Sequence, residues 1–87
     1  MDVKDLRYFI AVYETKGFSR ASFQLGTVQS NVSARIRGLE KFLGVELFER
    51  HPFGIVPTRK GEALYVQAKP LLASIQQAEQ SIRLATP

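Results

Sequence analysis

The stretch that decides the fold runs over residues 18–44 and reads FSRASFQLGTVQSNVSARIRGLEKFLG. Its first third predicts a short helix over residues 19–25, because Gly26 suits the left-handed conformation that ends many helices. The remainder predicts a longer helix over residues 28–43, ended in the same way by Gly44. The longer helix carries an apolar stripe at spacings of 4, 3 and 4, formed by Val32, Ile36, Leu39 and Leu43. A short helix, a tight glycine turn and a longer helix form a helix-turn-helix arrangement.

Local signals at the start of this stretch agree with two helices that meet at an angle. Ser19 is expected to cap the short helix, since a serine hydroxyl accepts from the first free N–H groups. Phe18 and Phe23 have the spacing of a hydrophobic staple around that cap. Val32 is expected to fill the angle between the two helices.

The residues before this stretch predict another helix, over residues 3–16. Asp2 and Asp5 are placed to cap its start, and Gly17 is placed to end it. One apolar face has the helical spacing i, i+3, i+4 and i+7 and consists of Leu6, Phe9, Ile10 and Tyr13. A second apolar strip consists of Tyr8, Ala11 and Val12. Because this strip points elsewhere, we expect something beyond the domain core to cover it, and a dimer partner is one candidate.

After Gly44 the hydrophobic pattern changes from the period of a helix to that of a strand. VELFER at 45–50 and IVPT at 55–58 predict two short strands, which HPFG at 51–54 joins by a tight loop. Pro57 restricts the second strand to the edge of a sheet. The sequence therefore predicts a two-stranded β wing beside a helical core.

The remaining residues, 59–87, predict one long helix that Thr58 can cap. Arg59 and Lys60 occupy its first turn, where the helix macrodipole disfavours cations. A nearby phosphate would offset that mismatch. The equal alternative is that two surface cations simply tolerate a penalty of a few tenths of a kcal/mol.

The long helix also carries a heptad seam. Its residues alternate at spacings of 4 and 3 and are Leu64, Ala68, Leu71, Ile75, Ala78, Ile82 and Ala85. The core of so small a domain cannot cover this stripe along its whole length. A second copy of the chain is therefore the expected partner. Pro70 lacks the N–H that would bond to Val66, so a kink or a loosened turn is expected there.

Composition limits the possible classes of function. The 87 residues suffice for one small domain, and with 45% hydrophobic residues the chain is too apolar for intrinsic disorder. No apolar run approaches the roughly 20 residues of a membrane span, and the first ten residues carry two acids where a signal peptide is basic. A cytoplasmic protein is therefore expected. With no cysteine and one histidine, neither an enzyme, a metal site nor a cofactor is expected.

The charges are unevenly distributed along the chain. The net charge is +4, and residues 15–39 and 50–61 carry cations but no acid. These two stretches flank an acidic patch between residues 40 and 49. Such clustering is typical of a face that binds anions, and a solvated surface explains similar charge runs about as often.

The face of the 28–43 helix opposite its apolar stripe contains no acid before Glu40. Its N-terminal half carries short polar side chains, which fit a major groove about 12 Å wide. A glutamine can pair with adenine, a serine can donate or accept, and an alanine can contact a thymine methyl. We therefore predict a DNA-binding face. The candidate base-contacting residues are Gln29, Ser30, Ser33, Ala34 and Arg35.

Over nearly its whole length the sequence resembles the N-terminal domain of the LysR-type transcriptional regulators. The matching segments are LRYF at 6–9, FSRA at 18–21, QSNVS at 29–33, IRGLE at 36–40 and LGVELFER at 43–50, followed by Thr58 and Gly61. The resemblance implies a mainly α fold, with a winged helix-turn-helix DNA-binding domain over residues 1–58 and a linker/dimerisation helix over residues 59–87. It further implies a bacterial transcription regulator that binds an interrupted inverted repeat in double-stranded promoter DNA as a homodimer.

The resemblance places Gln29, Ser30 and Ser33 on the base-contacting positions of the family. The residues expected to contact phosphate or to form the wing contact are Ser19, Arg20, Arg37, Arg50, His51, Phe53, Thr58, Arg59 and Lys60. The residues expected to form the dimer are Leu64, Ala68, Leu71, Ile75, Ala78 and Ile82.

Three residues depart from the family pattern. Ala34 stands where many members have an arginine or another long polar residue, with Arg35 beside it, so the strongest guanine contact is missing or displaced. Phe53 stands where the wing commonly has a basic residue, which leaves His51 or Arg50 to supply the minor-groove contact and leaves open whether Phe53 or His51 enters the groove. Val28 replaces a frequent serine N-cap, which moves that role to Thr27.

Members of the family continue into a far larger effector-binding domain that this sequence does not contain. A small-molecule effector is therefore expected to act only through that domain, and a tetramer is an alternative assembly for the full-length protein. The rival interpretation is a helical dimerisation module that binds proteins and no nucleic acid. The operator, the regulated genes, the effector and the choice between activation and repression do not follow from the sequence.

Overall fold

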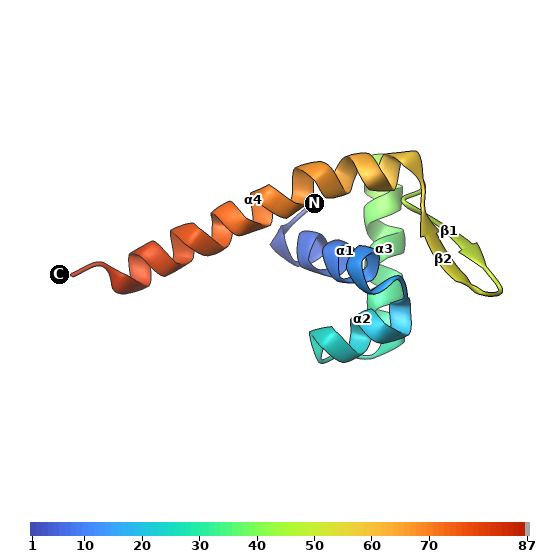
Figure 1. Cartoon of the computed structure of the whole chain (residues 1–87), viewed down its shortest axis with the longest axis horizontal. Helices are drawn as coiled ribbons and strands as arrows, with labels where there is room; N and C mark the ends of the chain where they lie inside the picture. Colours follow the sequence, from blue (N-terminus) through green and yellow to red (C-terminus); the bar gives the residue numbers. More distant parts are fainter. Residues whose placement is uncertain (87) are drawn as a thin grey trace.

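The computed structural model describes residues 1–86 as four helices and a two-stranded antiparallel sheet (Figure 1). In chain order these are α1 (Val3–Thr15), α2 (Phe18–Leu25), α3 (Gln29–Leu43), β1 (Phe48–His51), β2 (Gly54–Pro57) and α4 (Arg59–Leu84). The predicted winged helix-turn-helix fold with a long last helix is confirmed. The predicted 59–87 helix ends earlier, at Leu84, so Ala85 is not part of its seam. Pro87 lies outside the described residues.

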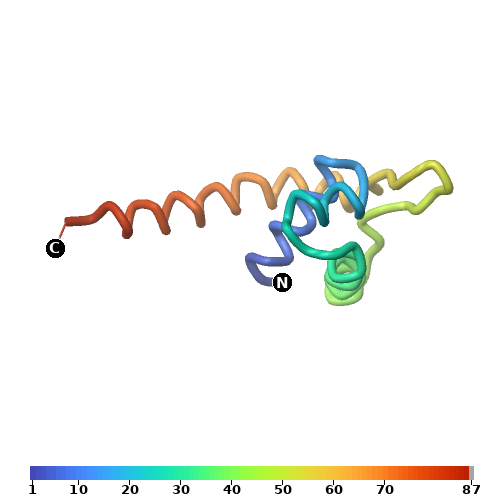
Figure 2. The backbone as a smooth tube through the Cα atoms, turned by 90° about the horizontal axis from the view of Figure 1, so that it is seen from below, coloured from blue at the N-terminus to red at the C-terminus, as the bar shows by residue number. Residues whose placement is uncertain are grey.

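The core lies where α1 is enclosed by α2, α3 and α4 (Figure 2). Phe9, Val32 and Ile36 are completely buried there, and Val32 fills the angle of the helix-turn-helix as predicted. In the second apolar strip of α1, Ala11 and Val12 are buried in the chain's own core, contrary to expectation, and Tyr8 is half-buried against it.

The short connection between α1 and α2 differs from the sequence prediction. Lys16, rather than Gly17, takes the left-handed conformation that ends α1, with φ 62°. Gly17 is instead the N-cap of α2, so Ser19, the predicted cap, lies inside the first turn. Phe23 is 91% exposed, so the predicted hydrophobic staple does not form. The chain must reverse within two residues here, and this requirement overrides the local capping preference.

The turn into α3 also lacks the predicted cap. Val28 is the N-cap and makes no side-chain hydrogen bond to the helix start. The hydroxyl of Thr27, the predicted cap, accepts a hydrogen bond from the side-chain amide of Asn31 at 3.0 Å. Gly26 and Gly44 take the predicted left-handed conformation after α2 and α3.

The start of α4 is fixed against the loop before the wing. Thr58 caps the helix as predicted, since its hydroxyl accepts from the N–H of Gly61 at 3.0 Å and donates to the carbonyl of Glu46 at 2.6 Å. A Cβ atom at position 61 would collide with the carbonyl oxygen of Leu47, so only glycine fits. α4 is continuous through Pro70 and projects beyond the body, giving a molecule of 54 × 25 × 19 Å (Figure 1).

Candidate nucleic-acid interface

A groove lies between the start of α2 and the wing, and it brings together residues that are distant in the sequence. Its lining combines cationic and polar side chains with backbone and consists of Lys16, Gly17, Phe18, Ser19, Arg20, Gln29, Arg50, His51, Pro52, Gly54 and Ile55. α2 begins here without a side-chain cap, so its first N–H groups add positive potential. The groove therefore has the charge and the donors to bind phosphate groups.

α3 meets this groove at its N-terminus, where Gln29 lines it. Gln29, Ser30 and Ala34 are exposed, as predicted. The first turn of α3 contains no acid and no side-chain cap. This end of α3 thus offers small and polar side chains with a favourable macrodipole for an approaching polyanion.

Ser33 is less accessible than the sequence suggested. Only 9% of it is exposed, because two guanidinium groups cover it. Its hydroxyl accepts from Arg37 at 2.7 Å and, more weakly, from Arg50 at 3.5 Å. Ser33 is therefore placed to position two cations at the interface.

Arg50 joins the wing to both helices of the helix-turn-helix. Its guanidinium lies 4.7 Å from the ring centroid of Phe18, which is buried at the start of α2. The same group reaches Ser33 on α3. Arg20 is held in a similar way, because it donates to the carbonyl of Thr15 at the end of α1 at 3.0 Å. Both cations are thus oriented before any ligand binds.

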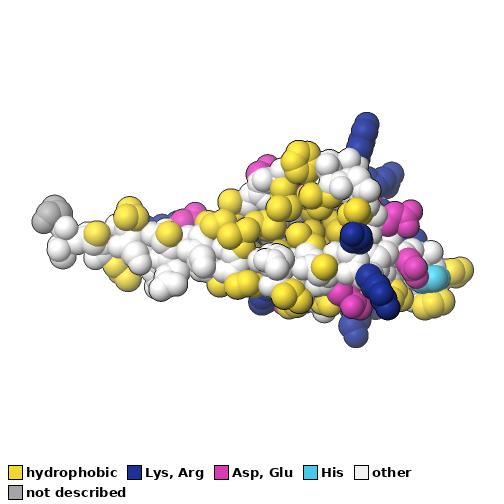
Figure 3. Space-filling view, turned by 90° about the horizontal axis from the view of Figure 1, so that it is seen from above, with side chains coloured by type: hydrophobic (Ala, Val, Ile, Leu, Met, Phe, Trp, Pro, Cys, Tyr) yellow, Lys and Arg dark blue, Asp and Glu magenta, His cyan; other side chains and the backbone are white. Residues whose placement is uncertain are grey.

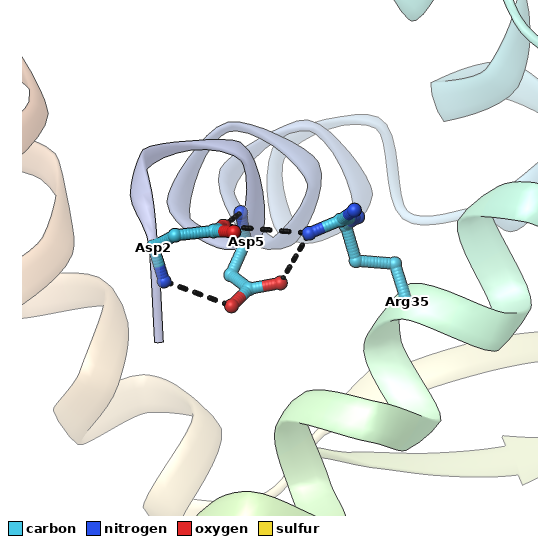
Figure 4. A network of polar contacts seen from close by, with 3 residues as sticks. All are labelled: Asp2, Asp5 and Arg35. Carbon is cyan, nitrogen blue, oxygen red and sulfur yellow. Dashed lines mark hydrogen bonds and ion pairs between the residues drawn. The ribbon is translucent and has the colours of Figure 1, made fainter.

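The side chain of Arg35, a candidate base-contacting residue, points toward the start of α1 and its two aspartates (Figure 4). Its guanidinium pairs with Asp5 at 2.8 Å and with Asp2 at 3.3 Å, at the start of α1. The N–H of Asp5 and, to a smaller extent, Arg35 hold the pKa of Asp2 below its ordinary value. Although the stretch around Arg35 contains no acid, the fold therefore brings Arg35 next to two aspartates of α1, and this ion pair connects α3 to α1.

The wing is anchored to α3 by a carboxylate. Glu40 accepts hydrogen bonds from the N–H groups of Leu47 at 2.7 Å and Phe48 at 3.4 Å. Part of the acidic patch of the sequence is therefore used to hold the wing against α3. Phe48 pairs with Pro57 at the base of the sheet, and His51 pairs with Gly54 next to the turn.

The tip of the wing is aromatic rather than cationic. Phe53 is 82% exposed and stacks on His51, with ring centroids 4.9 Å apart and an interplanar angle of 10°. His51 also contacts the carboxylate of Glu49 at 3.4 Å. The two residues left open by the sequence thus form one unit.

Three further predicted contacts lie at the start of α4. Thr58 is half-buried and its hydroxyl is used by the helix cap, so it is a structural residue of the wing base. Arg59 and Lys60 are exposed in the first turn, as predicted. The groove next to α2 does not include them.

The predicted dimerisation seam divides into two parts. Ala68 is only 1% exposed because it packs into the chain's own core, and Leu64 and Ile75 pack against that core as well. Of these three, only Ala68 is buried, and Leu64 and Ile75 each keep part of their side chains exposed. Leu71, Ala78 and Ile82 are exposed. Figure 3 shows hydrophobic side chains along the projecting part of α4, while most charged side chains on this face lie toward the wing.

Sequence reasoning missed two residues at this site. Lys16 lines the groove, and its place in the acid-free stretch next to a glycine was the available signal. Glu40 was counted only as part of an acidic patch, and its bonds to two N–H groups could not be foreseen from spacing. Among the described residues, no helix combines the length and apolar character required to cross a bilayer.

A family model supports the interpretation of the fold and the groove. The model described as bacterial regulatory helix-turn-helix protein, lysR family, matches residues 3–62. Two curated relatives are transcriptional regulators of the HTH type. HdfR of Escherichia coli is 43% identical over 82 residues, which are 94% of this chain and 29% of HdfR. BudR of Raoultella terrigena is 41% identical over 73 residues, which are 84% of this chain and 25% of BudR.

Two solved structures are similar over almost the whole chain. The BenM_DBD/catB site 1 DNA complex has a TM-score of 0.91 and 34% identity, covering 100% of this chain and 99% of that one. CbnR, a LysR family transcriptional regulator, has a TM-score of 0.90 and 33% identity, covering 98% of this chain and 29% of that one. The chain thus spans about a quarter to a third of the length of the curated relatives it matches.

Proposed function

The chain belongs to the lysR family of bacterial regulatory helix-turn-helix proteins, and we propose that it binds specific double-stranded DNA as a homodimer and regulates transcription. The observation that carries this proposal is the groove in which the uncapped start of α2, the first residue of α3 and Arg50 of the wing converge. The similarity to a DNA-bound relative over 100% of the chain supports it. We infer that the chain acts as a DNA-binding module rather than an enzyme, and that it acts on promoter DNA in the bacterial cytoplasm.

The exposed residues at the start of α3 are assigned to base contacts. Gln29, Ser30 and Ala34 approach the major groove, and Ser33 acts from beneath by positioning Arg37 and Arg50. Arg35 is left out of the base-contacting set because Asp2 and Asp5 hold it. Ala34 supports contact with a thymine methyl rather than with guanine.

Phosphate contacts are assigned to the groove and to the cations around it. Ser19, Arg20 and Arg50 line the groove, Arg37 lies on α3 beside Ser33, and Arg59 and Lys60 occupy the first turn of α4 after the wing. His51 and Phe53 extend from the tip of the wing toward the minor groove. Such contacts fix register and orientation on the duplex without conferring sequence preference.

Dimerisation is assigned to the exposed part of the predicted seam, Leu71, Ala78 and Ile82. Two copies would present two α3 helices to an interrupted inverted repeat. Effector binding and any tetramer belong to the longer relatives' additional residues and are proposed only for a full-length protein.

The test begins with duplexes selected by the chain from a random library and inspected for twofold symmetry. Affinity for the selected duplex should fall steeply with salt, each neutralised phosphate adding about 0.9 to the slope of log K against log salt. A flat salt response and equal binding of random duplexes would instead favour the protein-interaction module.

Two substitutions separate base contacts from phosphate contacts. Gln29→Ala should reduce discrimination between selected and random duplexes by roughly 1–3 kcal/mol, whereas Arg50→Ala should weaken binding to both alike. Gln76→Ala and Arg83→Ala are the matched controls, since both residues are exposed on the projecting part of α4. If Gln29→Ala lowered both affinities equally, the assignment of Gln29 to base contact would be wrong.

A further inference from the structure

Four side chains form a contact between α1 and α4 that the proposed DNA interface does not use. The rings of Tyr13 and Tyr65 stack with centroids 3.9 Å apart and an interplanar angle of 6°. The hydroxyl of Tyr65 and the ammonium of Lys69 both donate to one carboxylate oxygen of Glu14, each at 2.5 Å. We call Tyr13, Glu14, Tyr65 and Lys69 the α1–α4 strap.

The strap is assembled in the protonation states that these contacts require. Hydrogen bonds from Lys69 and Tyr65 lower the pKa of Glu14, so the carboxylate is charged and accepts both. The same bonds raise the pKa of Lys69 and of Tyr65, so both keep the proton they donate. Around neutral pH these groups therefore hold the protons that their hydrogen bonds require.

Because of its position, the strap can influence the direction in which α4 leaves the body of the molecule. Beyond Ile75 every described residue of α4 is exposed, so contacts earlier in the helix set where the projecting part points (Figure 2). Tyr65 and Lys69 are one helical turn apart and hold the flank of α4 to the last turn of α1. Thr15, next to Glu14, accepts from Arg20 of α2, so the strap ends beside the proposed phosphate contacts.

A small change in this direction would matter on DNA. A tilt of about 10° displaces a group roughly 30 Å away, the length of a 20-residue helix, by about 5 Å. One base pair rises by only about 3.4 Å along the duplex. If α4 carries the dimer contact, the angle between α4 and the body fixes the distance between the two α3 helices.

We propose that the α1–α4 strap, with Tyr65 at its centre, sets the spacing between the two half-sites that the dimer accepts. Tyr65 is a positioning residue: it touches no base or phosphate and acts through the direction of α4. This inference rests on the proposed function, because it concerns a dimer on paired half-sites.

The first experiment measures the geometry without DNA. The chain has no cysteine, so Lys41→Cys gives one spin-label site per chain, at an exposed position near the end of α3. Pulsed electron resonance then reports the distribution of distances between the two labels of a dimer. Adding Tyr65→Ala should broaden this distribution about twofold while the helical circular dichroism stays unchanged.

The second experiment measures spacing preference on the selected duplex, with the spacer changed by up to two base pairs in either direction. Simultaneous engagement of two sites raises affinity by a factor on the order of 100 or more, so the unchanged chain should lose at least about tenfold when the spacer is wrong. Tyr65→Ala should reduce this preference to about threefold or less, with little change on a single half-site.

Conservative variants cover the case in which Tyr65→Ala fails to fold. Tyr65→Phe keeps the stack and removes both the donor and its bond to Glu14, and Lys69→Met removes the other donor; both should give intermediate broadening. Tyr8→Phe is the matched control, since Tyr8 is also half-buried and lies on α1 without touching Glu14.

The outcomes separate the two proposals. Folded strap variants with the unchanged chain's distance distribution and spacing preference would overturn the role of Tyr65. An unchanged chain that tolerates every spacer equally would overturn it too. A chain that binds no duplex specifically would refute the proposed function, and the label distances would still show whether the strap fixes α4.

Discussion

The two halves of α4 share one helix and one apolar repeat, but only the first packs against the core. In the packed half, residues 59–75, Gly61 and Ala68 are buried and Ile75 lies against the core. In the projecting half, residues 76–84, every side chain is exposed. The repeat therefore predicts an apolar stripe along a helix, but it does not predict whether the same chain or another copy covers that stripe.

The largest effect is expected from a methyl group at the start of the packed half. Gly61→Ala should destabilise the chain by about 3 kcal/mol, because the new Cβ would collide with the carbonyl of Leu47 and force α4 away from the wing base. Urea unfolding at fixed protein concentration measures this change.

Gly38→Ala is the matched control for that substitution, because Gly38 is also helical but has no heavy atom within 4 Å of an added Cβ. It should raise stability by up to about 1 kcal/mol, the usual advantage of alanine inside a helix. Equal effects at both glycines would show that helix propensity, not close approach, dominates position 61.

Two alanines of the same predicted seam allow the effect of a larger side chain on stability to be compared between the two halves. Ala68→Leu should destabilise the chain by about 2 kcal/mol, since the larger side chain overpacks a site that is only 1% exposed. Ala78→Leu, in the projecting half, should stay within about 0.5 kcal/mol of the unchanged chain at a protein concentration low enough to keep it monomeric. Similar losses at both positions would contradict the division of α4.

The projecting half, together with the exposed Leu71 just before it, should control association instead. Ile82→Glu should favour monomers by about 1.5 kcal/mol per protomer, because it removes apolar area that a second copy would cover. Light scattering over a concentration series measures the mass. Gln80→Glu, which adds the same charge nearby on the exposed helix, is the control, and an Ile82→Glu chain that stays as dimeric as this control would remove the seam from the interface.

The smallest effect concerns the strap and its dependence on pH. The folded-state pKa of Glu14 lies below its ordinary value of 4.5, so its contribution to stability is present above pH 4.5 and is lost as the pH falls through the lower folded value. The pKa of Tyr65 and that of Lys69 are raised, so their contributions are lost as the pH rises through values above 10.0 and 10.5.

The difference in urea midpoint between the unchanged chain and Glu14→Gln should therefore be largest near neutral pH and should shrink below about pH 4. It should stay small throughout, because the carboxylate is 36% exposed and solvent screens it. Glu79→Gln in the projecting half provides the reference. A constant difference across the whole range would mean that the charge of Glu14 does not hold the strap.

The sequence was sufficient at several positions where a local signal matched the structure. Gly26 and Gly44 end their helices, Thr58 caps α4, and the change to a period of two marks the wing. These features depend on neighbouring residues alone. The order and type of all elements could therefore be predicted, with boundaries within a few residues.

The sequence was insufficient where a residue's partner lies far along the chain. Arg35 has the spacing of an interface residue, but its charge is satisfied by Asp2 and Asp5, about thirty positions earlier. Ser33 was expected to be exposed, and guanidinium groups from α3 and the wing cover it. Helical periodicity gives the direction of a side chain relative to its own helix, whereas only the packed fold shows what meets it.

The bonds from Glu40 to the start of β1 have a consequence for protein engineering. Exchanging wings between members of the family is one way to change how a regulator is oriented on its operator. A crossover between residues 40 and 47 would separate this carboxylate from the two N–H groups that it accepts from. The transplanted hairpin would then lose its hydrogen bonds to α3. The transferable unit therefore begins upstream of Glu40, so that helix end and hairpin are inherited together.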